Sequence, residues 1–239
     1  MTPRAVVTGA SRGLGAALTR FLAGSGYDLL LTARGADDLN AFADSVQSYG
    51  VRVRALAGDV NDPVHRSAIR ASVESDGALD LLVNNASELG PSPLPGLAGY
   101  PLEALAHVYA TNVIAPIAMV QALRPSLARA HGWIVNISSD AALGGYPGWG
   151  GYGASKAALD LASRTLANEL RGEGITVVSV DPGDLRTALN QAAYPGEDIS
   201  DRPVPDVTLP FFAWLLHQPG PAVSGQRFRA QAERWEVSP

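Results

Sequence analysis

The sequence contains no cysteine among its 239 residues. Disulfide bonds, thiolate nucleophiles and zinc–thiolate sites are therefore excluded, and thiols give no indication of the redox compartment. Histidine is scarce as well. Its four copies are scattered, with no second ligand at helical or strand spacing: His65, His107, His131 and His217. We therefore predict no metal site.

Charge and long hydrophobic runs are also limited. Charged residues make up 17% of the chain and hydrophobic residues 46%, which is typical of a packed globular protein. The net charge of −5 argues against general binding to nucleic acid or to membrane surfaces, because both are polyanionic. No run approaches about eighteen apolar residues, and Met1-Thr2-Pro3-Arg4 leads directly into a strand-like segment, without an export signal. We expect a soluble, cytoplasmic protein.

Short β-branched or leucine-rich runs recur along the chain and predict strands. They are Ala5–Thr8, Asp28–Thr32, Val51–Ala57, Leu79–Asn84, Trp133–Ser138, Thr176–Asp181 and Arg227–Ala230. Between them, apolar residues recur with a spacing of about 3.6, which predicts helices. This alternation favours right-handed βαβ crossovers and a parallel sheet covered on both faces. We therefore expect one doubly wound α/β domain over residues 1–239.

Two segments interrupt the alternation: the Gly/aromatic run Gly144–Gly151, and the proline-containing stretch Asp184–Pro205, where no regular element is expected. Both could be ordinary surface loops. Because ligands of open α/β sheets bind beyond the carboxyl ends of strands, we interpret the second as a short substrate lid. Tyr146, Trp149 and Tyr194 either line a substrate pocket or only pack against one another.

A glycine turn, Thr8-Gly9-Ala10-Ser11-Arg12-Gly13-Leu14-Gly15, joins the first predicted strand to a helix. Glycines allow close approach of a pyrophosphate, and a helix N-terminus offers unpaired N–H donors. The spacing is GxxxGxG and differs from the general GxGxxG fingerprint. A purely structural helix cap is the alternative interpretation.

The second predicted strand is followed by Arg34, where the general fingerprint places an acid that binds the ribose 2′-hydroxyl. Arginine can instead pair with a 2′-phosphate, which Arg12 of the glycine turn can also approach. NADP(H) is therefore favoured over NAD(H), by about tenfold to a hundredfold for one good contact. Alternatively, Arg34 begins a solvated loop and pairs with Asp37 or Asp38.

Five motifs occur in order from Val6 to about Thr187: Thr8-Gly9-x-x-x-Gly13-x-Gly15, Asn84-Asn85-Ala86, Asn112, Ser139 and Tyr152-x-x-x-Lys156. With them the chain resembles the classical short-chain dehydrogenase/reductase (SDR) family. The resemblance implies a Rossmann-type sheet of seven strands in the order 3-2-1-4-5-6-7, an oxidoreductase activity, and a homodimer or homotetramer. One small departure is Ser87, where glycine is commoner, and we expect it to alter only local packing.

The resemblance also implies which residues bind the cofactor. Asp59 and Val60 would contact the adenine, Asn85 would stabilise the central strand, and the segment from Pro182 to Thr187 would hold the nicotinamide carboxamide. The full set comprises Gly9, Ser11, Arg12, Gly13, Leu14, Gly15, Arg34, Asp59, Val60, Asn85, Ala86, Tyr152, Lys156, Pro182, Gly183, Leu185 and Thr187.

Tyr152 and Lys156 are four residues apart at the start of a predicted helix, so both rise from one face. A neighbouring ammonium and a positively charged nicotinamide favour the phenolate, and we expect the pKa of Tyr152 to fall toward neutrality. Tyr152 is then the acid in reduction and the base in oxidation. By resemblance, Lys156 also binds the nicotinamide ribose.

Ser139 precedes Tyr152 by thirteen positions, the spacing of the family, whereas Ser138 would point to the opposite face. We expect the Ser139 hydroxyl to hold the substrate oxygen without acting as a nucleophile. Asn112 resembles the family's helix-kinking asparagine, which holds a water beside the lysine in a proton relay. Ser155 follows no GxSxG elbow, which disfavours a hydrolase.

These residues favour a carbonyl reductase that uses NADPH and acts on a small molecule. Two alternatives remain: an SDR-type epimerase or dehydratase, whose usual C-terminal extension is not seen here, and a cofactor-sensing regulator, which usually lacks the tyrosine or lysine. Alanine-rich helices around Leu102–Leu123 and Gly153–Leu170 are consistent with close packing between subunits. The sequence predicts neither the substrate nor a role for residues 231–239.

Overall fold

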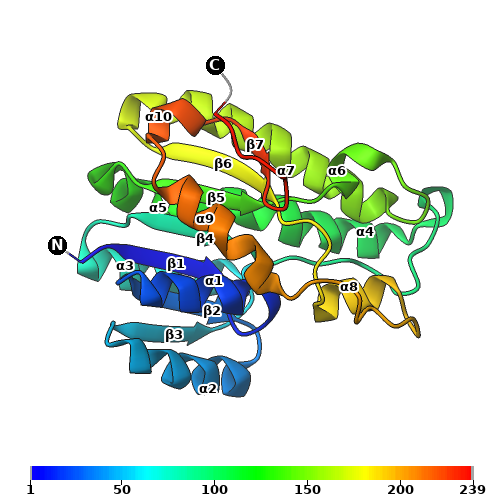
Figure 1. Cartoon of the computed structure of the whole chain (residues 1–239), viewed down its shortest axis with the longest axis horizontal. Coiled ribbons are helices and arrows are strands. Elements are labelled where there is room, and N and C mark those ends of the chain that lie inside the picture. Colours follow the sequence, from blue (N-terminus) through cyan, green and yellow to red (C-terminus); the bar gives the residue numbers. More distant parts are fainter. Residues whose placement is uncertain (1, 238–239) are drawn as a thin grey trace.

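The computed structural model describes residues 2–237, which form a seven-stranded parallel sheet in the order β3-β2-β1-β4-β5-β6-β7 (Figure 1). The strands are β1 Arg4–Thr8, β2 Asp28–Ala33, β3 Val53–Ala57, β4 Leu81–Asn84, β5 Trp133–Ile137, β6 Thr176–Asp181 and β7 Arg227–Arg229. All seven predicted strands are present, and the predicted order is confirmed. Small differences lie at the ends: Val51–Arg52 and Leu79–Asp80 precede the strands that were predicted to include them.

Ten α-helices connect or flank the strands in the described part of the chain. They are α1 Gly13–Gly24, α2 Ala36–Val46, α3 Pro63–Asp76, α4 Leu102–Tyr109, α5 Ala115–Ala130, α6 Ala141–Gly144, α7 Gly150–Glu169, α8 Ala188–Ala193, α9 Leu209–Leu216 and α10 Gly220–Val223. Short 3₁₀ turns lie at Gln47–Tyr49, Leu97–Gly99, Arg171–Glu173 and Pro205–Thr208, and the π-helical turn η3, Ala110–Ile114, joins α4 to α5.

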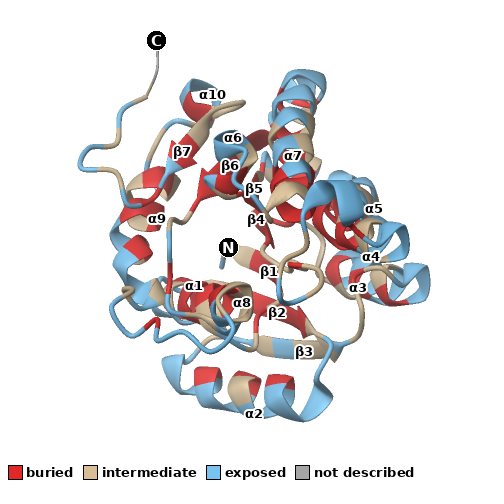
Figure 2. Cartoon of the chain, turned by 90° about the vertical axis from the view of Figure 1, so that its right-hand side faces the viewer, coloured by how far each residue is buried: buried red, intermediate tan, exposed pale blue. Residues whose placement is uncertain are grey.

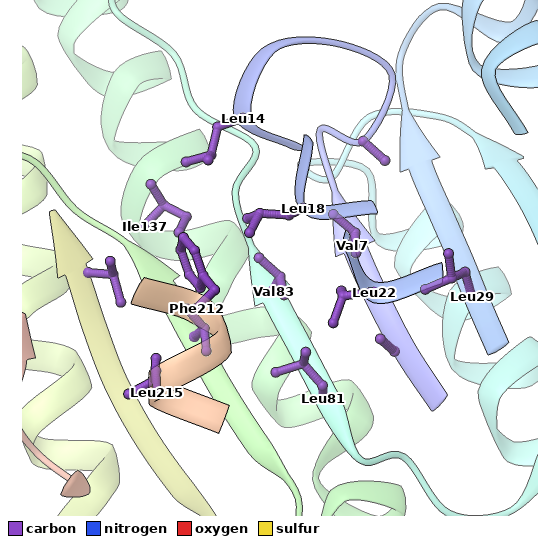
Figure 3. Packing of buried hydrophobic residues seen from close by; sticks show 14 of the residues in the cluster. Val7, Leu14, Leu18, Leu22, Leu29, Leu81, Val83, Ile137, Phe212 and Leu215 are labelled. Carbon is purple, nitrogen blue, oxygen red and sulfur yellow. The ribbon is translucent and has the colours of Figure 1, made fainter. Parts of the chain in front are cut away.

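The core lies on both faces of the sheet, because successive residues of each buried strand point to opposite sides. Val7 packs with α1, α2 and α9, whereas its neighbour Val6 packs with α3, α5 and α7. Figure 3 shows Phe212 of α9 among residues of α1 and the central strands. In Figure 2 the buried residues follow the strands and the inward sides of the helices.

The helix from Leu102 to Ala130, which comprises α4, η3 and α5, is long and apolar enough to cross a membrane by length and composition, with a hydropathy of 1.2. Its inward residues, including Met119, Leu123 and Leu127, pack in the core beneath the sheet. A core helix passes the same test, and the packing places the inward side of this helix in the core of the domain.

A short helix, α8, lies within the second of the two segments that interrupt the alternation, and the ends of α6 and α7 extend into the first. The prediction of no regular element between residues 184 and 205 is wrong, since α8 forms where the stretch has no proline and Thr187 caps it by accepting from the Asn190 N–H at 3.2 Å. The glycine/aromatic run is reduced to residues 145–149 between α6 and α7. Figure 1 places α6 and α8 beyond the carboxyl ends of the strands.

Candidate active site

A cavity of about 670 Å³ opens at the carboxyl ends of the strands. It brings together almost all residues predicted for the site: Gly9, Ser11, Arg12, Gly13, Leu14, Arg34, Asp59, Val60, Asn85, Ala86, Ser139, Tyr152, Lys156, Pro182, Gly183, Leu185 and Thr187. The two predicted residues that do not line it, Gly15 and Asn112, are buried behind its wall. The cleft therefore lies where the sequence predicted it, beyond the carboxyl ends of the strands.

The glycine turn is shaped by close backbone contacts. Gly9 and Gly13 have positive φ angles of 65° and 55°, which side-chain-bearing residues rarely adopt. A Cβ atom on Gly15 would overlap the Gly9 carbonyl oxygen. The Asn85 amide donates to the Thr8 and Gly9 carbonyls at 3.0 and 3.1 Å, which fixes the turn to the central strands. The N-terminus of α1 thus faces the cavity, with no side-chain cap.

Arg34 and Arg12 both line this end of the cavity. The Arg34 side chain is 62% exposed and pairs with Glu88 at 3.8 Å, so its partner is neither of the two aspartates considered from the sequence. Asp38 also lines this end and brings one carboxylate near the arginines. An exposed guanidinium held by a long, screened ion pair is free to turn toward a phosphate.

Tyr152 and Lys156 lie in the first two turns of α7, and both are buried, with 7% and 2% of their surfaces exposed. Lys156 is the single lysine of the chain. Its Nζ lies 5.5 Å from the centre of the Tyr152 ring and donates to the Ile137 carbonyl at 2.8 Å. The predicted shared face is therefore confirmed, with β5 supplying an acceptor for the ammonium.

Burial dominates the electrostatics of this pair. It raises the pKa of Tyr152 to about 12, with Asp181 and Asp140 adding to the rise and hydrogen bonds from Ser87 and Ser139 opposing it. Burial also lowers the pKa of Lys156 to about 8, with partial compensation by Asp160. In the chain without cofactor, the pKa is raised because removing the phenolate from water outweighs the effect of the nearby hydroxyls. The lowered pKa was expected with a positively charged nicotinamide beside the ring, and it stays a prediction for the bound state.

The two neighbouring serines have different surroundings. The Ser139 hydroxyl opposes the rise in the pKa of Tyr152, donates to the Asp140 carboxylate at 3.1 Å and accepts from the Ala141 N–H at 3.1 Å. Ser138 is 1% exposed, and its hydroxyl has no hydrogen-bond partner within residues 2–237. The geometry thus pairs Ser139, rather than Ser138, with the tyrosine.

Asn112 lies in the π-helical turn η3 and is fully buried. Its amide nitrogen donates to the Glu88 carbonyl at 2.8 Å and to Ser155 at 2.9 Å, while its oxygen accepts from the Glu88 N–H at 2.8 Å and from Ser87 at 3.1 Å. Ser155 in turn donates to the Tyr152 carbonyl at 2.6 Å. The side chain therefore joins the loop after β4 to the helix that carries the reacting pair.

Two residues of this site were missed from the sequence. Ser87 was expected to affect only packing, yet its hydroxyl donates to Asn112 at 3.1 Å and opposes the rise in the pKa of Tyr152. Its position directly after Asn85-Ala86, beyond the end of β4, could have identified it as a site residue from the sequence. The second residue, Arg227, lies in β7, far from every motif.

Arg227 connects three parts of the site beneath the cavity. Its guanidinium pairs with Asp160 of α7 at 2.9 Å and with Asp181 of β6 at 3.2 Å, and it donates to the Ser139 carbonyl at 2.8 Å. The three charged side chains are 16%, 11% and 3% exposed. This ion-pair network fixes β5, β6 and α7 relative to one another.

The aromatic residues of the two interrupting segments line the far end of the cavity. Tyr146, Trp149 and Tyr194 all contribute to its wall, and Trp149 also packs against Tyr152 and Tyr194. All three rings therefore line the cavity, and Trp149 and Tyr194 also pack against each other.

Comparison with known proteins finds dehydrogenases and reductases. A family model described as short chain dehydrogenase matches residues 3–198. The chain is 37% identical over 213 residues to 2-(R)-hydroxypropyl-CoM dehydrogenase of Xanthobacter autotrophicus, covering 84% of this chain and 82% of that protein. It is also 37% identical over 199 residues to L-xylo-3-hexulose reductase of Hypocrea jecorina, which covers 75% of this chain but only 65% of that protein.

A solved structure has the same fold. It is a short chain dehydrogenase from Shigella flexneri in complex with NADP, and it superposes with a TM-score of 0.89 at 27% identity. The match covers 96% of this chain and 97% of that one, so it includes the strands and loops that surround the cavity.

Proposed function

This chain belongs to the short-chain dehydrogenase/reductase family, and from that premise we propose that it is an NADP(H)-dependent carbonyl reductase. Membership makes the protein an NAD(P)-dependent oxidoreductase. The phosphorylated cofactor, the carbonyl substrate and the roles of individual residues are our proposal. The observation that carries it is the buried Tyr152, with the Lys156 Nζ 5.5 Å from its ring centre, in a cleft that Ser139 also lines and that has a glycine turn and two arginines at its other end.

The cleft has the features that a dinucleotide requires. Its volume of about 670 Å³ suits a cofactor together with a small substrate, and a Cβ atom on Gly15 would disrupt the turn that exposes the N-terminus of α1. Ser11, Gly13 and Leu14 would hold the pyrophosphate, Asp59 and Val60 the adenine, and Leu185 and Thr187 the nicotinamide end. When bound, the cofactor supplies the hydride that reduces the carbonyl carbon.

Tyr152 supplies the proton that completes the reduction. Its hydroxyl proton moves to the substrate oxygen as negative charge develops there, giving an alcohol. Ser139 holds that oxygen by a hydrogen bond. Tyr152 is protonated at neutral pH, so its hydroxyl carries the proton that the reduction consumes.

Lys156 and Asn112 assist the proton transfer without contacting the substrate. An ammonium has three donors, and since the Ile137 carbonyl takes one, two remain for the ribose hydroxyls. The side chain of Asn112 is saturated by protein partners, so any contact with a relay water comes from the main chain of the π-helical turn.

Selection of NADP(H) rests on Arg34 and Arg12. Both line the end of the cleft opposite Tyr152, where Arg34 must exchange its long ion pair with Glu88 for the 2′-phosphate. The NADP complex of the structural relative from Shigella flexneri supports this choice.

Three further proposals concern the whole chain. Residues 184–205 serve as a substrate lid on a single domain that spans residues 1–239. The exposed Leu102 and Ile114, on the long helix, and Leu161, on α7, favour assembly into a homodimer or homotetramer through these helices. We place the protein in the cytoplasm, acting on a small molecule, without a nucleic-acid or membrane partner.

The test is oxidation of NADPH and NADH, followed by absorbance, against a panel of ketones, aldehydes, quinones and β-keto esters. We expect turnover with NADPH, and a loss of about a hundredfold to ten-thousandfold in Tyr152→Phe. NADPH binding by the variant is measured in parallel, and it should be retained. Equal rates in the wild type and in Tyr152→Phe would refute the acid role.

A further inference from the structure

A row of aromatic rings leads outward from the reacting hydroxyl. Trp149 meets Tyr152 edge to face, with ring centres 5.8 Å apart and planes inclined by 69°. Tyr194 follows, with its ring centre 6.1 Å from that of Trp149. All three residues line the cavity, so one wall of its substrate end is aromatic from the site of proton transfer to the lid segment.

Tyr194 is held in place before any ligand arrives. The Arg202 guanidinium lies 4.1 Å from the centre of its ring and donates to the Asn190 side chain at 2.9 Å. Asn190 is itself anchored, because its amide donates to the Leu185 carbonyl at 2.9 Å. Arg202 does not line the cavity, so it covers Tyr194 from outside. A ring fixed in this way binds a flat partner with little loss of side-chain entropy.

The charged side chains at this end of the cavity are acidic. Asp140 and Asp184 line it together with Tyr146, whose pKa is raised chiefly by Asp140, with smaller contributions from Asp181 and Asp184. The lysine at this end is buried and donates to the Ile137 carbonyl. The arginines that line the cavity, Arg12 and Arg34, lie at the cofactor end. An anionic substrate would therefore meet two carboxylates and no exposed cation in the lining.

From this combination we infer that the enzyme reduces uncharged or cationic aryl ketones and aldehydes, and discriminates against carboxylated or phosphorylated ones. The inference rests on the proposed function. A flat ring beside the carbonyl would pack against Trp149 and Tyr194 while its oxygen reaches Tyr152 and Ser139. The acid pair at the rim would oppose any negative group that the substrate carries.

The aromatic part is tested with acetophenone and cyclohexyl methyl ketone, which differ mainly in the flatness of the ring. We expect kcat/KM to be about tenfold higher for acetophenone in the wild type. Tyr194→Leu should remove most of this preference, and Tyr194→Phe, which keeps the ring, should retain it. Equal kcat/KM values for the two ketones in the wild type would overturn the aromatic part.

The charge part is tested with 4-acetylbenzoate and its neutral methyl ester. We expect the ester to react about tenfold faster in kcat/KM at low salt, with a smaller ratio at high salt because the carboxylates are exposed. Asp184→Asn should lower the ratio about threefold, since it removes one of the two charges. A ratio near one, or a ratio unchanged by this substitution, would overturn the charge part.

Failure of the inference and failure of the proposed function give different results. Turnover of aliphatic or anionic carbonyls in preference to acetophenone refutes the inference alone. If no carbonyl is reduced although NADPH binds, the proposed function fails. The same ketones are then titrated into the NADP⁺-loaded protein by tryptophan fluorescence, with Trp149→Phe to identify the reporting ring. Binding in the order acetophenone, cyclohexyl methyl ketone, 4-acetylbenzoate supports the pocket assignment, and any other order or no binding overturns it.

Discussion

The two ends of the cleft place charge in opposite ways. At the cofactor end, the cradle is made of glycine backbone, and its charged side chains are exposed, as Arg34 is at 62%. At the catalytic end, Asp140 and Asp184 are also exposed, but Lys156, Arg227 and Asp181 are all buried or nearly so. Exposed charges interact weakly and are screened by salt, whereas buried charges are costly unless paired and shift one another's pKa values. The same type of side chain therefore selects a ligand at one end and determines stability and proton affinity at the other.

The largest expected effect is at the buried ion-pair network. Arg227→Leu leaves Asp160 and Asp181 without their cation, and we expect the free energy of unfolding to fall by about 3–5 kcal/mol. Urea denaturation measures the loss. The matched control is Arg124→Leu, which breaks an exposed arginine–glutamate pair with Glu173 and should cost far less. Equal losses in the two variants would remove the distinction between buried and exposed charge.

A steric change should break the cofactor end without altering charge. In Gly15→Ala the new methyl group overlaps the Gly9 carbonyl, so the turn must open and NADPH affinity should fall by about a hundredfold. Fluorescence titration of NADPH measures this. Gly172→Ala, at a position with no atom near the added Cβ, serves as the control and should bind normally. Unchanged affinity in Gly15→Ala would contradict the backbone cradle.

Features of the cleft that depend on residues close together in the sequence could be predicted, whereas features that depend on distant residues could not. The glycine turn and the Tyr152/Lys156 pair follow from local spacing, whereas the strand order was implied by the family resemblance, and the structure reproduces all three. Arg227 could not be found in this way, because its partner Ser139 lies 88 residues away and no motif joins them. The raised pKa of Tyr152 in the chain without cofactor could not be found from the sequence for the same reason, since burial depends on the whole fold.

Stability should depend on pH through the buried lysine. Its pKa is lowered from 10.5 to about 8 in the folded chain, so between these values the unfolded chain binds the proton and the folded chain does not. The free energy of unfolding therefore rises with pH in this window, and below it the cost of burying the ammonium is fully present. The raised pKa of Tyr152 acts only above pH 10, with the opposite sign.

We expect this lysine to contribute about 2–3 kcal/mol to the change in unfolding free energy between pH 8 and 10. The comparison is with Lys156→Met, which keeps the length of the side chain and removes the titration. Denaturation curves at pH 8, 9 and 10 for both proteins isolate the contribution, which no other lysine can supply. A difference between them that does not vary with pH would contradict the account.

The smallest expected effect is at the exposed arginine. Arg34→Ala should raise KM for NADPH by about tenfold and leave KM for NADH nearly unchanged, because only the former carries the 2′-phosphate. The increase should shrink at high salt, as expected of a screened contact. Steady-state kinetics at two salt concentrations measures both. Equal changes in KM for NADPH and NADH would mean that Arg34 does not bind the 2′-phosphate.

The central claim is that hydride passes from the cofactor to a carbonyl carbon beside Tyr152. The most direct measurement uses NADPH deuterated at one of the two C4 positions of the nicotinamide, with the ketone that reacts fastest in the panel. The account predicts deuterium on the alcohol carbon from one of the two labelled diastereomers and none from the other, because a fixed site presents one face of the ring to the substrate. Label from both diastereomers, or an alcohol without deuterium from either, would contradict it.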